Sequence, residues 1–216
     1  MALTIHNVRG DGNCYYRCIW NIVKNHDEYA NAFYINDADQ KTEDDGAQEI
    51  REYVALSVKY EQFPKDILIN LVEIYKSTPD IISMYPLLQH VDDDLDFDQL
   101  VSTVAREIEE TNMMASSYEH EIVKARLNSL AYDYIGDLQL IILSKACNVK
   151  EDDVAEKWLF ELHSALQNTQ CDKIALLINE DNIHYKYMKF GRKTIIHRLE
   201  LENYVDACIA TYTDSE

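Results

Sequence analysis

The chain has 216 residues, 47% of them hydrophobic, which suits one domain with a buried core and excludes wholesale disorder. Its 39 acidic residues outnumber 20 basic ones, for a formal net charge of −19. We therefore expect no unaided binding to nucleic acid or to an anionic membrane surface, and we expect a basic partner. No run approaches the ~20 apolar residues that a membrane span needs, and the first residues do not resemble a secretory signal.

The cysteines indicate a reducing environment. There are five, an odd number, and no Cys-x-x-Cys pair occurs. This pattern favours neither a disulfide framework nor a zinc ribbon. We expect free thiols in a cytosol-like compartment, either in the cell that makes the protein or in a host cell that a secreted effector or viral protein reaches.

The first part of the chain is predicted to be mainly helical. Residues 2–8 alternate as a short strand does, and 14–25 place apolar side chains on one helical face. Five acids make 37–45 an exposed loop. An amphipathic helix is expected over 47–60, and another over about 64–76, which begins with a proline.

The middle of the chain is also predicted to be helical, apart from an irregular segment over 79–91. Helices are expected over 95–111, 117–132, 137–147 and 152–167.

Strand signals return near the C-terminus. Two apolar runs, 173–179 and 183–190, are separated by a short polar turn and predict a hairpin. A strand from Thr194 and a helix over 199–210 follow. The pattern as a whole predicts an α+β fold in which helices flank a small central β-sheet.

One segment has the residue types of a catalytic site. Glycine is scarce, five residues where ~15 are usual, yet Gly10 and Gly12 both lie within four residues of Cys14. A glycine-bearing loop before a helix can direct amides toward a developing oxyanion. The positive helix N-terminus favours the thiolate of a cysteine placed there. This pattern predicts a nucleophile with its oxyanion donors.

A structural interpretation fits the same residues. Asp11, Gly12 and Asn13 are common turn residues, and Asn13 suits a helix N-cap. Cys14 and Cys18 are four residues apart and could both be buried hydrophobes. A metal site is disfavoured because no second ligand pair accompanies them. The residues alone leave a nucleophilic and a structural cysteine both open.

The segment 11–17, Asp-Gly-Asn-Cys-Tyr-Tyr-Arg, resembles the Asp-Gly-Asn-Cys-Leu-Phe-Arg signature of the ovarian tumour (OTU) family of cysteine proteases. Two other segments are similar to the family in the same order. Residues 134–140, leading into Ala146, resemble its Trp-Gly-Gly stretch and the helix after it. His184 and Tyr185, after the strand at 174–178, resemble its catalytic His-Tyr pair.

The resemblance implies a papain-like OTU fold and a deubiquitinase, which cleaves the (iso)peptide bond after the C-terminal glycine of ubiquitin. The partner would be ubiquitin, a polyubiquitin chain or another ubiquitin-like modifier, and no metal or cofactor is implied. We expect a single catalytic domain over 1–216, with a helical substrate-recognition region over 61–115.

The resemblance also implies residue roles. Cys14 would be the nucleophile, His184 the general base, and Asp11 a motif residue that shapes the loop through hydrogen bonds to its backbone. Gly12 and Asn13 would belong to the oxyanion loop. We expect five of the other histidines to lie on solvated faces or in local hydrogen bonds: His26, His90, His120, His163 and His197. His6 precedes the motif loop by a few residues and could lie close to it in space.

One position departs from the family pattern. Many members have Asp or Asn two residues after the catalytic histidine, and this chain has Lys186, which cannot accept the imidazole hydrogen. The candidates for a third triad member are Asn182, two residues before the histidine, and Asn7, near the end of the first strand. The departure also keeps an alternative open, a weak or inactive OTU-like module that binds ubiquitin or another basic protein. A third possibility, an acidic mimic of nucleic acid, rests on the net charge alone.

Overall fold

The computed structural model describes residues 2–60, 97–110, 117–129, 138–145, 151–180 and 184–213. Within these ranges the chain is α+β, as the sequence predicts. The helices are α1 (Cys14–Val23), α2 (Asp27–Ala32), the short 3-10 helix η1 (Ala38–Gln40), α3 (Glu43–Lys59), α6 (Phe97–Glu110), α7 (Ser117–Ser129), α8 (Glu151–Gln167) and α9 (Arg198–Thr213). The strands are β1 (Leu3–Asn7), β2 (Leu138–Lys145), β3 (Lys173–Glu180), β4 (His184–Phe190) and β5 (Ile196–His197).

The strands form one mixed sheet in the order β1-β4-β3-β2, with β5 also paired to β3. Only β2 and β3 are parallel, and the other pairs are antiparallel. The five residues Ile174–Ile178 of β3 are all buried, which explains why this strand is apolar without alternation. The expected hairpin is confirmed by the antiparallel pairing of β3 with β4.

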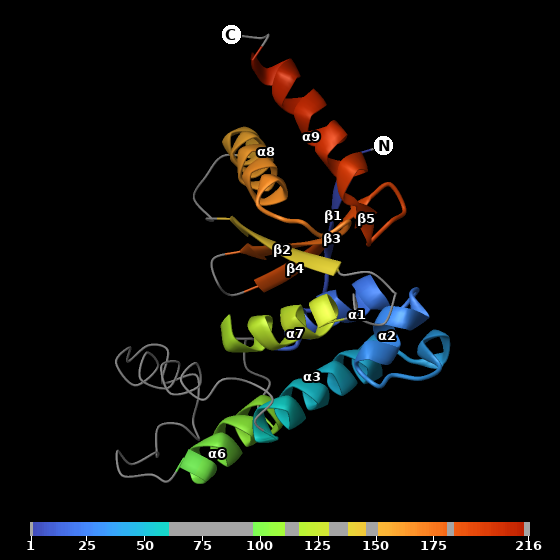
Figure 1. Cartoon of the computed structure of the whole chain (residues 1–216), viewed down its shortest axis with the longest axis vertical. Coiled ribbons are helices and arrows are strands. Elements are labelled where there is room, and N and C mark those ends of the chain that lie inside the picture. The colour runs from blue at the N-terminus through green and yellow to red at the C-terminus, as the bar shows by residue number, and fades with distance from the viewer. Residues whose placement is uncertain are drawn as a thin grey trace.

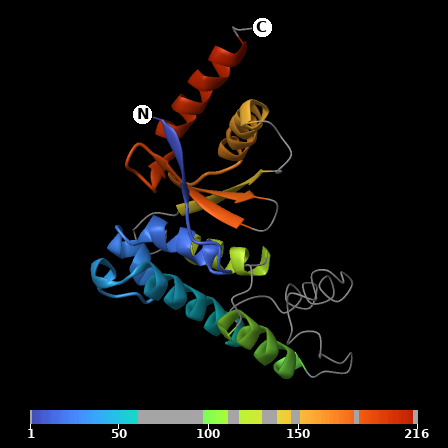
Figure 2. The same cartoon turned by 180° about the vertical axis from the view of Figure 1, so that it is seen from behind.

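The sheet separates two helical layers (Figure 1). Helices α8 and α9 lie on one face, and α1 and α7 lie on the other, with α3 and α6 forming a further layer beyond them. The view from behind shows β1 running along the sheet toward the α1 layer (Figure 2). Each face has its own apolar cluster, and β4 serves both, with Tyr185 and Tyr187 on the α1 side and Met188 and Phe190 on the α9 side. The alternating side chains of a strand account for this division.

Helix α1 is buried along its whole length between the sheet and α3. Close packing with α3 depends on Gly46, where an added Cβ would lie 2.2 Å from Cδ2 of Trp20. Helix α3 begins with a capping box, in which the Thr42 hydroxyl accepts from the Asp45 amide and the Asp45 carboxylate accepts from the Thr42 amide. These contacts fix the first turn of α3 beside the loop that precedes α1.

Two predictions of secondary structure are wrong. The helix expected over 137–147 is the strand β2, which pairs with β3. Its buried residues are Leu138, Leu140, Ile141 and Leu143, and a short, mostly apolar segment of this kind does not distinguish a buried strand from a buried helix. The helix that the OTU resemblance implied after residue 140 is therefore absent at 138–145. The loop expected over 37–45 is also too long, since α3 already begins at Glu43.

The other expected helices in the described ranges are confirmed within a few residues. The predictions for 64–76 and 79–91 lie outside the described residues, and so does most of the proposed recognition region, of which α6 is described. In the described part of the chain, no helix is long and apolar enough to cross a membrane.

Candidate active site

The segment before α1 has the tight loop that its glycines predict. Gly12 has a φ of 83°, in the left-handed region that glycine adopts readily. The carboxylate of Asp11 accepts a hydrogen bond of 3.1 Å from the backbone amide of Asn13. Asn13 is the N-cap of α1 by position, and Cys14 is its first residue. Asp11 therefore shapes the loop that carries the cysteine.

His184 is joined to Asn7 across the sheet. The Nε2 atom of His184 lies 2.7 Å from Oδ1 of Asn7. Asn7 is paired with Lys186 in the register of β1 and β4, and His184 lies two residues before Lys186 on the same face. A carbonyl oxygen only accepts, so Nε2 carries the hydrogen and Nδ1 keeps its lone pair.

The free nitrogen of His184 lies beside the glycine loop. A Cβ added to Gly10 would be 3.5 Å from Nδ1 and 3.6 Å from Cε1 of this ring. The next residue, Tyr185, directs its backbone N–H toward the sulfur of Cys14. The start of β4 thus brings the imidazole and the thiol to the same loop, with Gly10 leaving room for the ring.

The thiol of Cys14 is more enclosed than the sequence predicts. The residue is 2% exposed, and burial raises the pKa of its thiol. Backbone N–H groups of Tyr185, Tyr15 and Cys14 favour the thiolate, but they do not offset the loss of solvent, and the charge of Asp11 opposes them. The sequence predicts that the helix N-terminus favours the thiolate, but here burial outweighs that effect and the pKa of the Cys14 thiol is raised.

The imidazole of His184 is shifted toward its neutral form. Burial and the nearby Lys186 ammonium lower the pKa of His184, while the Glu180 carboxylate raises it. Lys186 does not replace the missing acceptor, because its Nζ lies 2.7 Å from Oε2 of Glu180 in an ion pair. Asn7 occupies the neighbouring strand position and takes the acceptor's place.

A charged network holds the loop against α3. Arg17 is 3% exposed, and its Nε and Nη2 donate to the two oxygens of Asp11 at 3.2 and 2.7 Å. The same guanidinium also contacts Asp44 in the first turn of α3, and Arg9 bridges Asp11 and Asp44 at 2.7 and 3.0 Å. The hydrogen bonds from these arginines hold the pKa of Asp11 well below its usual range. Acids that the sequence assigned to a loop therefore brace the candidate site.

Sequence reasoning missed Arg51 of α3. This arginine is 1% exposed, donates to the side-chain carbonyl of Asn13 and to the backbone carbonyl of Ile108, and lies 5.2 Å from the ring centroid of Tyr16. The Asn13 amide is thus engaged with α3 and makes no side-chain cap. The sequence holds a signal for this role. Arg51 comes directly after Ile50, a residue of the apolar stripe of α3, and a cation that is buried there needs a hydrogen-bonding partner.

The sequence predicts the surroundings of His120 wrongly. The sequence predicts a solvated face or a local hydrogen bond, whereas the His120 ring packs against the rings of Tyr15 and Tyr185, and burial lowers its pKa to about 4. Its Nε2 lies 2.9 Å from the hydroxyl of Tyr185, which also accepts from Asn179 at 3.0 Å. The ring of Tyr15 packs 4.5 Å from the His120 ring. The aromatic residue next to His184 is therefore anchored from α7.

Two candidates remain, Asn182 and Cys18. Asn182 falls outside the described residues, so Asn7 is the described candidate that hydrogen-bonds to His184. Cys18 is fully buried and its pKa is raised well above the usual value. Among the described residues, no three His, Cys, Asp or Glu side chains are placed to hold a metal ion.

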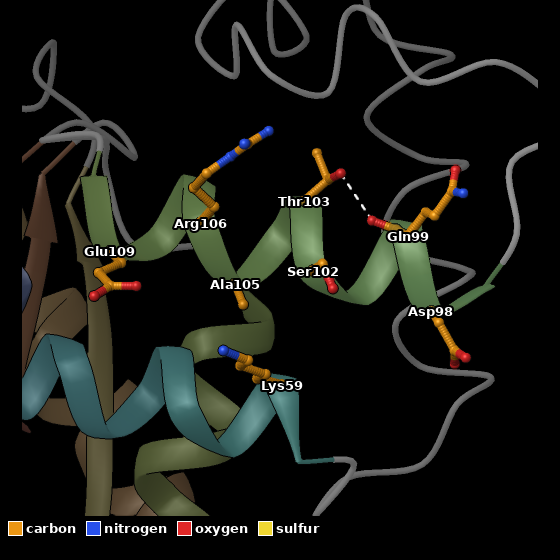
Figure 3. A pocket seen from close by; sticks show the side chains of 8 residues that line it. All are labelled: Lys59, Asp98, Gln99, Ser102, Thr103, Ala105, Arg106 and Glu109. Carbon is orange, nitrogen blue, oxygen red and sulfur yellow. Dashed lines mark hydrogen bonds between the residues drawn. The ribbon is translucent and has the colours of Figure 1, made fainter.

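A hollow of about 580 Å³ lies between α3 and α6. It is less suited to be an active site than the arrangement at Cys14 and His184. Figure 3 shows that Arg106 and Thr103 point to the side of α6 away from Lys59, and the Thr103 hydroxyl donates to the carbonyl of Gln99 at 2.8 Å. These side chains diverge, so we place the candidate active site at Cys14 and His184.

Comparison of the sequence with protein-family models and with curated proteins found no match.

Proposed function

We propose that the chain is a thiol-dependent hydrolase of the OTU type, which cleaves the (iso)peptide bond after the C-terminal glycine of ubiquitin. The observation that carries the proposal is the hydrogen bond between Asn7 and His184, which fixes one imidazole nitrogen and leaves Nδ1 beside the Cys14 loop. A thiol, an imidazole and an orienting amide are the parts of a papain-like catalytic triad.

In the proposed reaction, Nδ1 of His184 takes the proton of the Cys14 thiol as the sulfur attacks the carbonyl carbon of the scissile bond. The raised pKa of Cys14 and the lowered pKa of His184 describe a neutral pair at rest, so proton transfer accompanies attack. Asn7 accepts from Nε2–H and stabilises the imidazolium. Collapse of the tetrahedral intermediate breaks the C–N bond, and His184 returns the proton to the leaving amine. Water then hydrolyses the thioester.

The tetrahedral oxyanion would be stabilised by backbone amides at the start of α1. The amides of Cys14 and Tyr15 already face the sulfur, and the Asp11–Asn13 hydrogen bond fixes the loop before them. Loss of one such donor costs ~10²–10³ in rate in other enzymes. Rigid bracing of this loop by Arg17 and Arg51 supports the same role, because oxyanion donors act only when they are held in place.

The acidic surface supports a ubiquitin-like substrate. The tail of ubiquitin carries arginines next to its two glycines, and a protein with a net charge of −19 would attract it and speed encounter. We also propose that residues 1–216 form a single domain with a papain-like OTU fold, in which residues 61–115 recognise the substrate. The proposal also includes a reducing, cytosol-like compartment, in which Cys14 remains a thiol.

The experiment that tests this function uses ubiquitin with a thiol-reactive group at its C-terminus. We expect the native protein to form one covalent adduct, and Cys14→Ala to form none, whereas Cys208→Ala, which removes a half-buried thiol of α9, should react as the native protein does. An adduct that persists in Cys14→Ala, or no adduct with the native protein, contradicts the proposal.

A non-catalytic ubiquitin-binding module is the second candidate, and the enclosure of Cys14 favours it. Titration of the protein with iodoacetamide at neutral pH separates the two. A module without activity should bind ubiquitin, show no turnover and leave Cys14 unalkylated, whereas a hydrolase should lose its activity as Cys14 is alkylated.

A further inference from the structure

A second hollow lies on the side of α3 remote from Arg51 and the cysteine loop. It has a volume of about 640 Å³ and is formed by the segment after α2 together with the middle and end of α3. Tyr34, Tyr53 and Leu56 supply apolar lining, and neither Cys14 nor His184 lines it. Cavities of this size are typical of ligand sites.

The lining of this hollow is acidic as well as aromatic. Its charged residues are Asp37, Glu49, Glu52 and Lys41, three carboxylates and one ammonium group, a balance of 1 − 3 = −2. Lys41 is committed to Glu49, with Nζ 2.5 Å from Oε1. Among the described residues, Glu52 accepts from the neutral Gln48 amide and neither it nor Asp37 forms an ion pair. Arg126, which lies against two of the lining rings, reduces this balance to −2 + 1 = −1, so the hollow still attracts positive charge.

The tyrosine at its rim is held in an unfavourable backbone conformation. Tyr34 has a φ of 60°, in the left-handed region that bulky residues avoid, and it is 75% exposed. Strain of this kind often marks a functional position. Asp37 on the same rim also has a positive φ, of 54°.

The aromatic pair at this position already engages a cation from the protein itself. Arg126 of α7 lies 5.7 Å from the ring centroid of Tyr34 and 5.9 Å from that of Tyr53. Its Nε donates to the backbone carbonyl of Ala32, and Arg126 does not line the hollow. Arg126 therefore lies against the rings of both Tyr34 and Tyr53, whose centroids are 5.8 Å apart.

We infer that this hollow is a docking site for an arginine or lysine side chain of a protein partner. In the partner's sequence, aliphatic residues flank that arginine or lysine. Tyrosine faces attract cations, Glu52 and Asp37 supply the opposite charge, and Leu56, which is 50% exposed, receives the aliphatic neighbours. The site is independent of the thiol chemistry, because no residue of the proposed triad contributes to it.

The experiment titrates the full-length, isotope-labelled protein with two capped tripeptides and follows backbone amide shifts by NMR. One peptide is acetyl-Leu-Arg-Leu-amide, and the other carries citrulline, which matches arginine in shape without its charge. We expect saturable shifts centred on Tyr34, Glu52 and Tyr53, with the arginine peptide binding about tenfold more tightly than the citrulline peptide.

Three variants test the assignment. Tyr34→Asn suits a left-handed conformation and should keep the fold while weakening binding of the arginine peptide about tenfold. Glu52→Gln should weaken it about threefold to fivefold. The matched control is Glu109→Gln, an exposed glutamate of α6 that does not line this hollow, and it should leave affinity unchanged. Equal binding of both peptides, shifts that map elsewhere, or equal weakening by Glu109→Gln would overturn the inference, as would the absence of binding.

Discussion

Asn7 and His184 are 177 positions apart in the sequence, yet Oδ1 of Asn7 lies 2.7 Å from Nε2 of His184. The pairing of β1 with β4 brings them together, because Asn7 faces Lys186 and reaches diagonally to the histidine. The residue that orients the imidazole therefore lies on the strand next to the histidine's own strand.

Replacing Asn7 should affect catalysis more than binding. Asn7→Ala removes the acceptor that orients His184, so we expect kcat for a fluorogenic ubiquitin substrate to fall about 10- to 100-fold with little change in KM. Asn7→Asp retains an acceptor oxygen and should recover most of the rate. Asn25→Ala, at an exposed position after α1, is the control, and equal turnover in Asn7→Ala and Asn25→Ala would remove Asn7 from the mechanism.

The pH dependence of kcat/KM should respond in opposite directions to two substitutions beside the site. Lys186 lowers the pKa of His184 and Glu180 raises it. The base must be neutral, so the acidic limb of the profile follows this pKa. Lys186→Gln should therefore move the acidic limb to higher pH, and Glu180→Gln should move it to lower pH. Shifts of the same sign in both variants would show that a different group controls the limb.

The Asp11–Arg17 contact should stabilise the fold in a pH-dependent way. Asp11→Asn leaves Arg17 with its α3 partners only, so we expect a loss of about 1–3 kcal/mol in the free energy of unfolding at pH 7. The pKa of Asp11 is lowered in the folded state from its ordinary 3.8, so its contribution is complete above that value and is lost as the pH falls below it.

Urea denaturation of the native protein and Asp11→Asn over a pH series measures this effect. The difference between them should shrink as the medium becomes more acidic than pH 3.8. Asp39→Asn, at an exposed position in η1, should match the native protein at every pH. A difference that stays constant into the acidic range would contradict the assigned ion pair.

Gly46→Ala tests the packing of α3 on α1. Helix propensity alone predicts a gain of up to ~1 kcal/mol from this change, but the added Cβ would lie 2.2 Å from the buried Trp20 ring. We therefore expect a net loss of about 1–3 kcal/mol by denaturant unfolding. In a Trp20→Leu background the penalty of Gly46→Ala should become smaller, as a double-mutant cycle would measure. A stabilised Gly46→Ala protein would show that the two helices are not so closely packed.

The sequence predicts much of this architecture because local signals are strong where one face is buried. The stripe of Ile50, Val54 and Val58 locates α3, and the apolar runs around a polar turn locate β3 and β4. The sequence does not predict β2, because a strand that is buried on both faces and a buried helix are both rich in apolar residues and cannot be distinguished by composition.

The candidate site shows a similar division. Cys14 and the glycine loop are visible as a local motif, and the loop-shaping bond of Asp11 follows from its type. The roles of Arg51 and His120 depend on which elements lie against α1, which is a property of tertiary packing. The choice between Asn7 and Asn182 depends on strand register, which no single segment encodes.

The placement of β1 at the edge of the sheet, against the strand that begins with His184, has a consequence for biosynthesis. During translation Cys14 leaves the ribosome more than 160 residues before His184, and until then the strand that carries Asn7 has no β4 with which to pair. Chain closure over so long a separation is slow. In a nascent chain Cys14 therefore has no imidazole beside it, and the proposed activity would begin only after β1 has paired with β4.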